Sequence, residues 1–268
     1  MRKLFTLLLA IVASVSMAFS EIYSGTCGNG LNWSVDTKTG VLNISGEGTY
    51  NYSPYGYTPE EPWNSYKSQI SILKLGAGVQ SISPYYFYRC GLDSIFVDSE
   101  NPSYVAQDSV LFNKNKTTLV LYARNHRGSY EVPSGVTAIG DYAFYGSLLS
   151  EVILQGSVTT LGTYAFAGMS YLTNVVLSEG LTRIGDHCFY FSNYLKTINI
   201  PNSLTYVGDY AFIASQSKIA APLYNDRLFV FMPPLSMSSY SIPEGIQEIC
   251  AHAFYDNYIL SEILLPKS

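Results

Sequence analysis

The chain has 268 residues, of which 47% are apolar and only 13% are charged, and its formal net charge is −5. No cluster of Lys and Arg accompanies this acidic balance, so the sequence argues against a nucleic-acid partner. The length alone allows one or two globular domains. An internal repeat, described below, replaces that choice with one elongated array.

Residues 1–20 have the pattern of a secretory signal peptide. Arg2 and Lys3 form the positive start, residues 4–15 are apolar, and Ala18 and Ser20 provide a small-x-small cleavage site. The apolar stretch is short for a bilayer span, which makes a membrane anchor the weaker alternative. Without these residues 13 basic and 20 acidic residues remain, a net charge of −7. We therefore expect a secreted or cell-surface protein.

Residues 21–61 lack the repeat and are expected to form an N-terminal β cap. Residues 31–36 and 41–44 alternate in polarity around a turn at 37–40, which predicts a β-hairpin. Residues 46–62 are rich in Gly, Tyr and Pro and read as an irregular loop. A hairpin at this place would cover the open end of a stack of repeats.

Residues 62–268 carry a repeat that is clearest where Gly-Asp-Tyr-Ala-Phe144, Gly-Thr-Tyr-Ala-Phe166 and Gly-Asp-His-Cys-Phe189 recur at spacings of 22 and 23 residues. Each copy leads into a Leu-x-x-apolar-x-apolar segment that reads as a strand. A fixed period of this size predicts a solenoid, because one unit cannot bury its apolar face without neighbours. The expected fold class is a strand-rich α/β solenoid.

Two stretches, residues 98–130 and 218–240, interrupt the period and read as irregular insertions. Residues 109–112 and 117–122 flank a turn at 113–116, which predicts a hairpin inside the first insertion. The second contains the apolar run 228–231. The pattern ends at Ser268 without a polar closing segment, which predicts a truncated product or an end covered by another chain, self-association included.

The segment Ala143-Phe144-x-Gly followed by Leu149-x-x-Val152-x-Leu154 resembles the BspA-type leucine-rich repeat family. Residues 26–33, 108–119 and 222–228 resemble stretches that accompany such repeats. The resemblance implies a right-handed curved solenoid with one strand of each repeat on its concave side. It also implies a secreted or surface protein of bacteria that acts in adhesion or protein binding. No sorting segment follows the repeats, so the mode of surface attachment stays open.

Side chains between the core positions of each strand must point outward, because side chains alternate along a strand. Several of these outward residues are apolar, and an apolar stripe among polar groups is typical of an interaction surface. The alternative is that branched residues favour strands whether exposed or not. The strand face is expected to bind a protein partner, such as a host surface or matrix protein, through Phe96, Glu151, Ile153, Asn174, Val176, Thr197, Asn199, Glu262 and Leu264.

An aromatic column stands two residues before each core Phe, and its members would lie side by side along one edge of the solenoid. A ladder of this kind could grip sugar rings, so carbohydrate binding is the alternative function. It could instead only shield the turns from water. The column consists of Tyr85, Tyr142, Tyr164, His187, Tyr210 and His252.

The chain offers no nucleophile motif, no phosphate loop and no metal-ligand spacing. Glu151 and Glu262 lie too many repeats apart to act as a carboxylate pair. We therefore expect a protein that is not an enzyme and holds no cofactor. The four cysteines fit no disulfide framework and are expected to be buried free thiols, although a bridge between Cys27 and Cys90 stays open.

Overall fold

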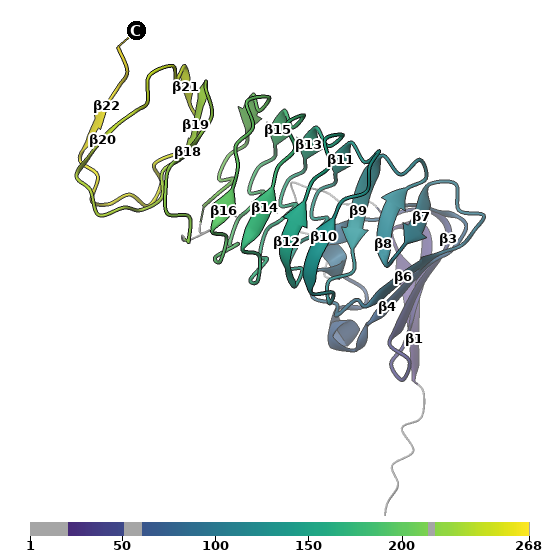
Figure 1. Cartoon of the computed structure of the whole chain (residues 1–268). Coiled ribbons are helices and arrows are strands. Elements are labelled where there is room, and N and C mark those ends of the chain that lie inside the picture. Colours follow the sequence, from purple (N-terminus) through teal and green to yellow (C-terminus); the bar gives the residue numbers. More distant parts are fainter. Residues whose placement is uncertain (1–20, 51–60, 214–217, 268) are drawn as a thin grey trace, which may run out of the picture.

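The computed structural model describes residues 21–50, 61–213 and 218–267. The predicted signal peptide, residues 1–20, lies outside these ranges. The described residues form an elongated, strand-rich array with the N-terminal strands at one end and the C-terminus at the other (Figure 1). Their only helices are two short 3-10 helices, η1 (Asn64–Gln69) and η2 (Pro84–Phe87). Among the described residues, no helix is long and apolar enough to cross a membrane.

The N-terminal cap is a three-stranded antiparallel sheet of β1 (Ile22–Cys27), β2 (Asn29–Asp36) and β3 (Val41–Thr49). The predicted hairpin between β2 and β3 is confirmed, and β1 is an addition. β3 pairs in parallel with β4 (Ile72–Leu75), which pairs with β6 (Ser94–Val97). The cap thus continues directly into the array.

The end of β3 was expected to be loop, and this expectation was wrong. β3 runs to Thr49, where it also pairs with β5 (Val79–Ser81). Gly46 and Gly48 have φ angles of 98° and 153°, and a Cβ on Gly48 would lie 1.9 Å from the carbonyl oxygen of Asn29. Glycine is therefore needed here for close strand approach rather than for a turn. The rest of the expected loop, residues 51–60, lies outside the described residues.

The coils that follow stack in parallel and place one short strand on each of two sides. The first side, called the strand face below, has the order β10-β12-β14-β16. The second side has the order β17-β15-β13-β11-β9 and continues into β8 and β7. The strand face comprises β10 (Gly128–Glu131), β12 (Leu149–Ile153), β14 (Asn174–Val176) and β16 (Thr197–Ile198), and the second side β9 (Thr118–Tyr122), β11 (Ala138–Ile139), β13 (Thr160–Leu161), β15 (Arg183–Ile184) and β17 (Tyr206–Val207).

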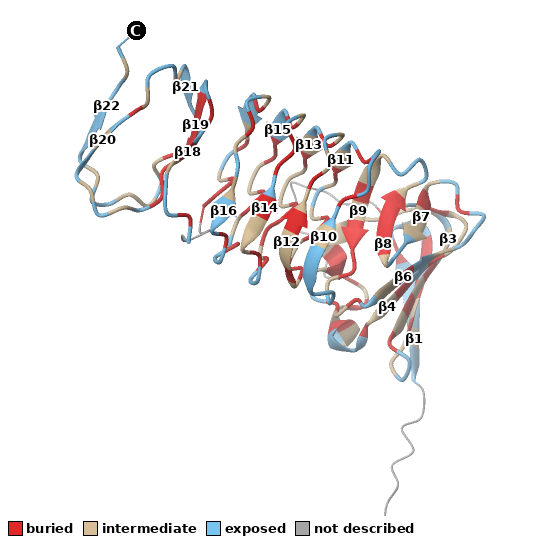
Figure 2. Cartoon of the chain, in the orientation of Figure 1, coloured by how far each residue is buried: buried red, intermediate tan, exposed pale blue. Residues whose placement is uncertain are grey.

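The core phenylalanines form a single row inside the coils, as the repeat predicted. Ring centroids are 5.0 Å apart between Phe144 and Phe166, 5.3 Å between Phe166 and Phe189, and 5.1 Å between Phe189 and Phe212. Each of these rings is almost fully buried, and Figure 2 shows buried residues from β8 to β19, whereas β20 and β22 are largely exposed. Burial of such side chains drives the stacking of coils that would not be stable alone.

The first insertion is a three-stranded meander rather than a plain hairpin. β8 (Val110–Asn113) and β9 pair antiparallel as predicted, and β7 (Tyr104–Gln107) pairs with the other edge of β8. β9 also pairs in parallel with β11, so it belongs to the array as one of its rungs. The second strand of the hairpin, β9, is therefore part of the solenoid sheet, and the hairpin is not a separate insertion beside it.

The second insertion follows the same plan. β18 (Leu223–Tyr224) pairs antiparallel with β19 (Leu228–Phe231), and β19 pairs in parallel with β21 (Glu248–Ile249). A last parallel pair, β20 (Ser239–Ser241) with β22 (Glu262–Leu264), completes the described chain.

A buried asparagine opens each insertion with the same hydrogen bonds. Asn101 Nδ2 donates to the carbonyls of Gly76 and Val79 in the preceding coil, at 2.8 and 3.0 Å. Its Oδ1 accepts the amides of Ser103 and Tyr104, both at 2.8 Å. The Asn101 side chain thus satisfies main-chain groups that lack the regular coil-to-coil hydrogen bonds, at the point where the repeat is interrupted.

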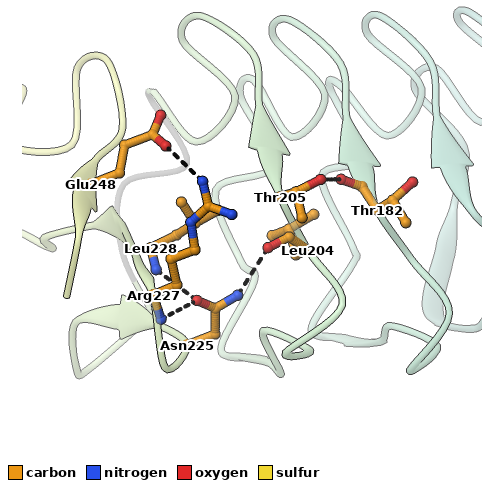
Figure 3. Close-up of polar contacts among 7 residues, drawn as sticks. All are labelled: Thr182, Leu204, Thr205, Asn225, Arg227, Leu228 and Glu248. Carbon is orange, nitrogen blue, oxygen red and sulfur yellow. Dashed lines mark hydrogen bonds and ion pairs between the residues drawn. The ribbon is translucent and has the colours of Figure 1, made fainter. Parts of the chain in front are cut away.

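Asn225 repeats this arrangement (Figure 3). Its Nδ2 donates to the carbonyls of Pro201 and Leu204, at 3.0 and 3.1 Å, and its Oδ1 accepts the amides of Arg227 and Leu228, at 2.9 and 2.7 Å. The two irregular units therefore enter the solenoid through equivalent joints.

Surface threonines tie successive coils together on the second side. Each Oγ1 donates to the main-chain carbonyl of the threonine one coil before it, at 3.1–3.2 Å, and Figure 3 shows the Thr205–Thr182 pair. The donors are Thr137, Thr159, Thr182 and Thr205. These hydroxyl groups therefore form hydrogen bonds that hold neighbouring coils together.

All four cysteines are buried and free, as expected, so Cys27 and Cys90 are not bridged. Burial raises the pKa of the Cys90 thiol to about 12 and that of the Cys27 thiol to about 11. The thiols therefore act as small apolar side chains of the core rather than as nucleophiles.

Candidate functional site

Three of the predicted binding residues form a hydrogen-bonded row across the strand face. Glu151, Asn174 and Thr197 are in register on β12, β14 and β16. Asn174 Nδ2 donates to Glu151 Oε1 at 2.5 Å, and Thr197 Oγ1 donates to Asn174 Oδ1 at 2.8 Å. The row presents one carboxylate and its ordered neighbours to solvent.

The next row along the same strands is apolar. Ile153 and Val176 are opposite one another on β12 and β14; Ile153 is half-buried and Val176 is 40% exposed. Asn199 follows at the end of β16, where its side chain accepts the amide of Leu177 at 2.7 Å and donates to the Leu177 carbonyl at 2.8 Å. Asn199 thus completes the strand ladder, a role that its position in the sequence did not reveal.

A groove of about 570 Å³ lies on this face. β14 and β16 line one side of it, and the irregular segment of residues 219–223 lines the other. Four predicted residues, Asn174, Val176, Thr197 and Asn199, belong to its lining, together with Lys196, Val175, Ile198, Ile219, Ala220, Ala221, Pro222 and Leu223. The groove combines an apolar lining with a few polar groups, as binding sites do.

The remaining predicted residues lie in other sheets. Phe96, 53% exposed, is on β6 of the N-terminal sheet, where it lines a separate hollow of about 470 Å³ with Lys74. Glu262 and Leu264 are exposed on β22, whose only strand partner among the described residues is β20. The nine predicted residues therefore occupy three sheets instead of one continuous face.

The aromatic column is present, and its rings stack from Tyr142 onward, whereas Tyr85 meets Tyr142 edge-on at 5.2 Å and 67°. Centroids are 5.0 Å apart for Tyr142 and Tyr164, 4.6 Å for Tyr164 and His187, 5.2 Å for His187 and Tyr210, and 3.7 Å for Tyr210 and His252. Each of these five residues has a φ angle between 54° and 60°. This left-handed conformation is unfavourable for side chains other than glycine, so stacking offsets a local backbone cost.

Stacking has a consequence for sugar binding by this column. Interplanar angles from Tyr142 to His252 are 30° or less, so neighbouring rings cover one another's faces. Sugars stack on open aromatic faces. More exposed rings occur elsewhere, at Tyr171 and Tyr194, which are 49% and 52% exposed and line a hollow of about 460 Å³.

A buried ion pair joins Lys67 and Glu61, and sequence analysis did not predict it. Lys67 Nζ is 2.7 Å from Glu61 Oε2, and both side chains are over 90% buried. The ammonium also lies 5.0 Å from the centre of the Tyr88 ring. Removing either charge would leave the other buried and unpaired, which marks the pair as structural.

The backbone ladder that joins the coils is interrupted near the groove. Main-chain hydrogen bonds between described residues run from coil to coil as far as Ile213 and resume after Lys218, and none of them crosses between these parts. On the strand face the sheet ends at β16, and on the second side it ends at β17. We call this interruption the seam.

Side chains hold the seam together. Phe231 continues the phenylalanine row at 5.8 Å from Phe212. At the surface, Asn202 Nδ2 donates to Asp226 Oδ2 at 2.7 Å, and His252 Nδ1 lies 3.8 Å from Asp209 Oδ1. Between the described residues the seam is therefore closed by the core and by a few polar side-chain contacts, and no main-chain hydrogen bond crosses it.

These coils, with their row of phenylalanines and a strand in each repeat, define a leucine-rich repeat solenoid. The chain belongs to the BspA type leucine rich repeat region family, whose model matches residues 65–126, 124–219 and 227–268 in six copies. The resemblance seen in the sequence is thereby confirmed. A comparison with curated proteins gave no match.

Solved structures of bacterial leucine-rich repeat proteins share the fold. The crystal structure of the pneumococcal vaccine antigen PcpA is similar over 75% of this chain, with 22% identity and a TM-score of 0.55. The match spans 57% of the PcpA chain. A leucine-rich repeat protein from Eubacterium ventriosum matches over 90% of this chain and 95% of its own, with 20% identity and a TM-score of 0.47.

Proposed function

We propose that this protein is a secreted or surface-held recognition protein, without catalytic activity, that binds a protein partner through its strand face. Leucine-rich repeats generally serve protein interaction, and this chain consists largely of them. The similar pneumococcal protein is described as a vaccine antigen, which agrees with an exposed location. The pattern of residues 1–20 adds the expectation of export.

The groove beside β16 is the observation that carries this proposal. It places Val176, which is 40% exposed, next to the ordered polar side chains of Asn174 and Thr197. An apolar centre with a polar rim is the usual anatomy of a protein interface. A host surface or matrix protein is the partner we expect.

The test is capture on arrays of extracellular proteins and of glycans. Replacing Ile153 and Val176 by Asp places two charges on the strand face and should lower protein capture at least tenfold, while glycan capture stays unchanged. Ile249→Asp is the matched control, since Ile249 is also 40% exposed but lies on β21, in another sheet. Equal loss in the control, or full capture by the double variant, would refute the strand face as the binding surface.

Carbohydrate binding is the second candidate, and the structure favours a different place for it than the stacked column. The exposed rings of Tyr171 and Tyr194 border a hollow with Ser170 and Thr173. The Arg127 guanidinium lies 4.9 Å from the centre of the Tyr171 ring and adds a positive charge. On the same arrays, glycan capture that is lost in Tyr194→Ala and kept in the double Asp variant would support this candidate.

A further inference from the structure

We propose that the groove binds an extended peptide segment of a partner protein, which pairs with β16 as an additional strand. This inference rests on the proposed protein-binding function and specifies the form of the partner. It starts from the main-chain groups at the edge of β16.

The alternation of a parallel sheet determines which of these groups face the groove. The Thr197 amide donates to the Thr173 carbonyl, so the main chain of Thr197 faces β14. The N–H and C=O of Ile198 therefore face the opposite way, as does the N–H of Ile200. In the described part of the chain neither of these two amides has a hydrogen-bond partner.

Neighbouring coils show which main-chain hydrogen bond Ile200 lacks. At the position of Ile200, the amides of Val132, Leu154 and Ile242 each donate to a carbonyl in the next coil at 2.9 Å. Pro222 stands 23 residues after Asn199, where a paired strand would continue, and proline has no N–H that could donate to the Ile198 carbonyl.

Unpaired edge groups are a ready template for another strand. Here the edge lies beside a groove whose opposite wall contains the small side chains of Ala220 and Ala221. Lys196 also lines the groove, and it has no ion pair among the described residues. The positive charge favours a peptide with an acidic side chain, or a terminal carboxylate, near the start of β16.

The probe is a phage-displayed library of random linear peptides, selected on the chain expressed without residues 1–20. Ala221→Trp should fill the groove and lower the affinity of selected peptides at least tenfold. Ala138→Trp, on β11 of the second side, is the matched control and should leave the affinity unchanged. Thermal unfolding of both variants shows whether they remain folded.

Strand pairing is then tested on a selected peptide by moving a single N-methyl group along its backbone. We expect affinity to fall at every second amide, because only alternate amides of a strand face its neighbour. On binding, the amides of Ile198 and Ile200 should exchange their hydrogens at least tenfold more slowly.

Three results would overturn strand addition: no peptide that distinguishes Ala221→Trp from Ala138→Trp, N-methyl effects without alternation, or unchanged exchange at Ile198 and Ile200. Protein capture that still depends on Ile153 and Val176 would, in those cases, leave the proposed function intact. Loss of that dependence would instead remove the proposed function itself.

Discussion

Tyr164 shows how a single residue can be both strained and stabilising. Its φ angle is 55°, and its ring lies between those of Tyr142 and His187. The backbone cost of such a conformation is about 1–2 kcal/mol for a residue other than glycine. The ring contacts act in the opposite direction, each contributing roughly 0.5–1.5 kcal/mol beyond area burial.

This balance predicts an unusual order of stability at position 164. Tyr164→Ala loses the stack and keeps the backbone cost, whereas Tyr164→Gly loses the stack and relieves that cost. The Gly variant should therefore unfold at higher urea concentration than the Ala variant, by about 1 kcal/mol in free energy of unfolding. An Ala variant at least as stable as the Gly variant would contradict the role given to the left-handed backbone.

His187 introduces pH dependence into the same column. Burial lowers the pKa of His187 below its ordinary value of 6.5, while Asp186 and Asp209 act to raise it and His252 to lower it. Below pH 6.5 the unfolded chain therefore binds a proton more readily than the folded chain does. The stability contribution of neutral His187 is present above that pH and is lost as the pH falls through it.

His187→Tyr should accordingly reduce acid sensitivity, because tyrosine fills the same position in neighbouring coils and carries no charge at these pH values. Measured between pH 7 and pH 5, the melting temperature of wild type should fall further than that of the variant. Parallel falls in both proteins would show that His187 does not contribute to the acid response.

At the scale of elements, the seam divides the array into two stacks of coils. Hydrogen-bonded ladders run through β10-β12-β14-β16 and stop, and β19 with β21 begins another set. The Tyr210–His252 stack, the Asn202–Asp226 hydrogen bond and the Phe212–Phe231 contact join the two. Regions held by few main-chain bonds across a boundary open locally at lower free energy than their surroundings.

Hydrogen exchange should therefore be faster in residues 218–267 than in residues 136–213. His252→Ala removes the stack on Tyr210, so it should accelerate exchange after the seam and leave the preceding coils unchanged. Tyr255→Ala is the control, because Tyr255 is 47% exposed and its ring meets Tyr210 edge-on at 6.2 Å instead of stacking on it. Uniform acceleration along the whole array would mean that the two stacks open as one unit.

Taken as a whole molecule, the array was largely predictable because its coils repeat. The regular spacing of Phe144, Phe166 and Phe189 indicated a repeat. A repeat of buried aromatic residues is typical of stacked coils, and these rings do form one row. The strand-face residues Glu151, Asn174 and Thr197 also align as expected, since one register holds for successive coils. Their role in binding stays a prediction.

What the sequence did not reveal depends on contacts between units that do not repeat. The hydrogen bonds of Asn101 and Asn225 could not be predicted, because only the fold brings the carbonyls that they bind within reach. The separation of Phe96 from Val176 arises because β9 and its meander occupy the coils between them. Pro222 was the one sequence feature that indicated the seam. It was overlooked because the apolar residues keep their even spacing as far as Leu223.

The equivalent joints at Asn101 and Asn225 have an evolutionary consequence. Each joint lets an irregular unit enter and returns the chain to the parallel stack, at β9 in one case and β19 in the other. Duplication or deletion of gene segments bounded by these joints would change the number of coils while preserving the folding of their neighbours. Evolution could thus change the length of the solenoid and the shape of its surface in single genetic steps.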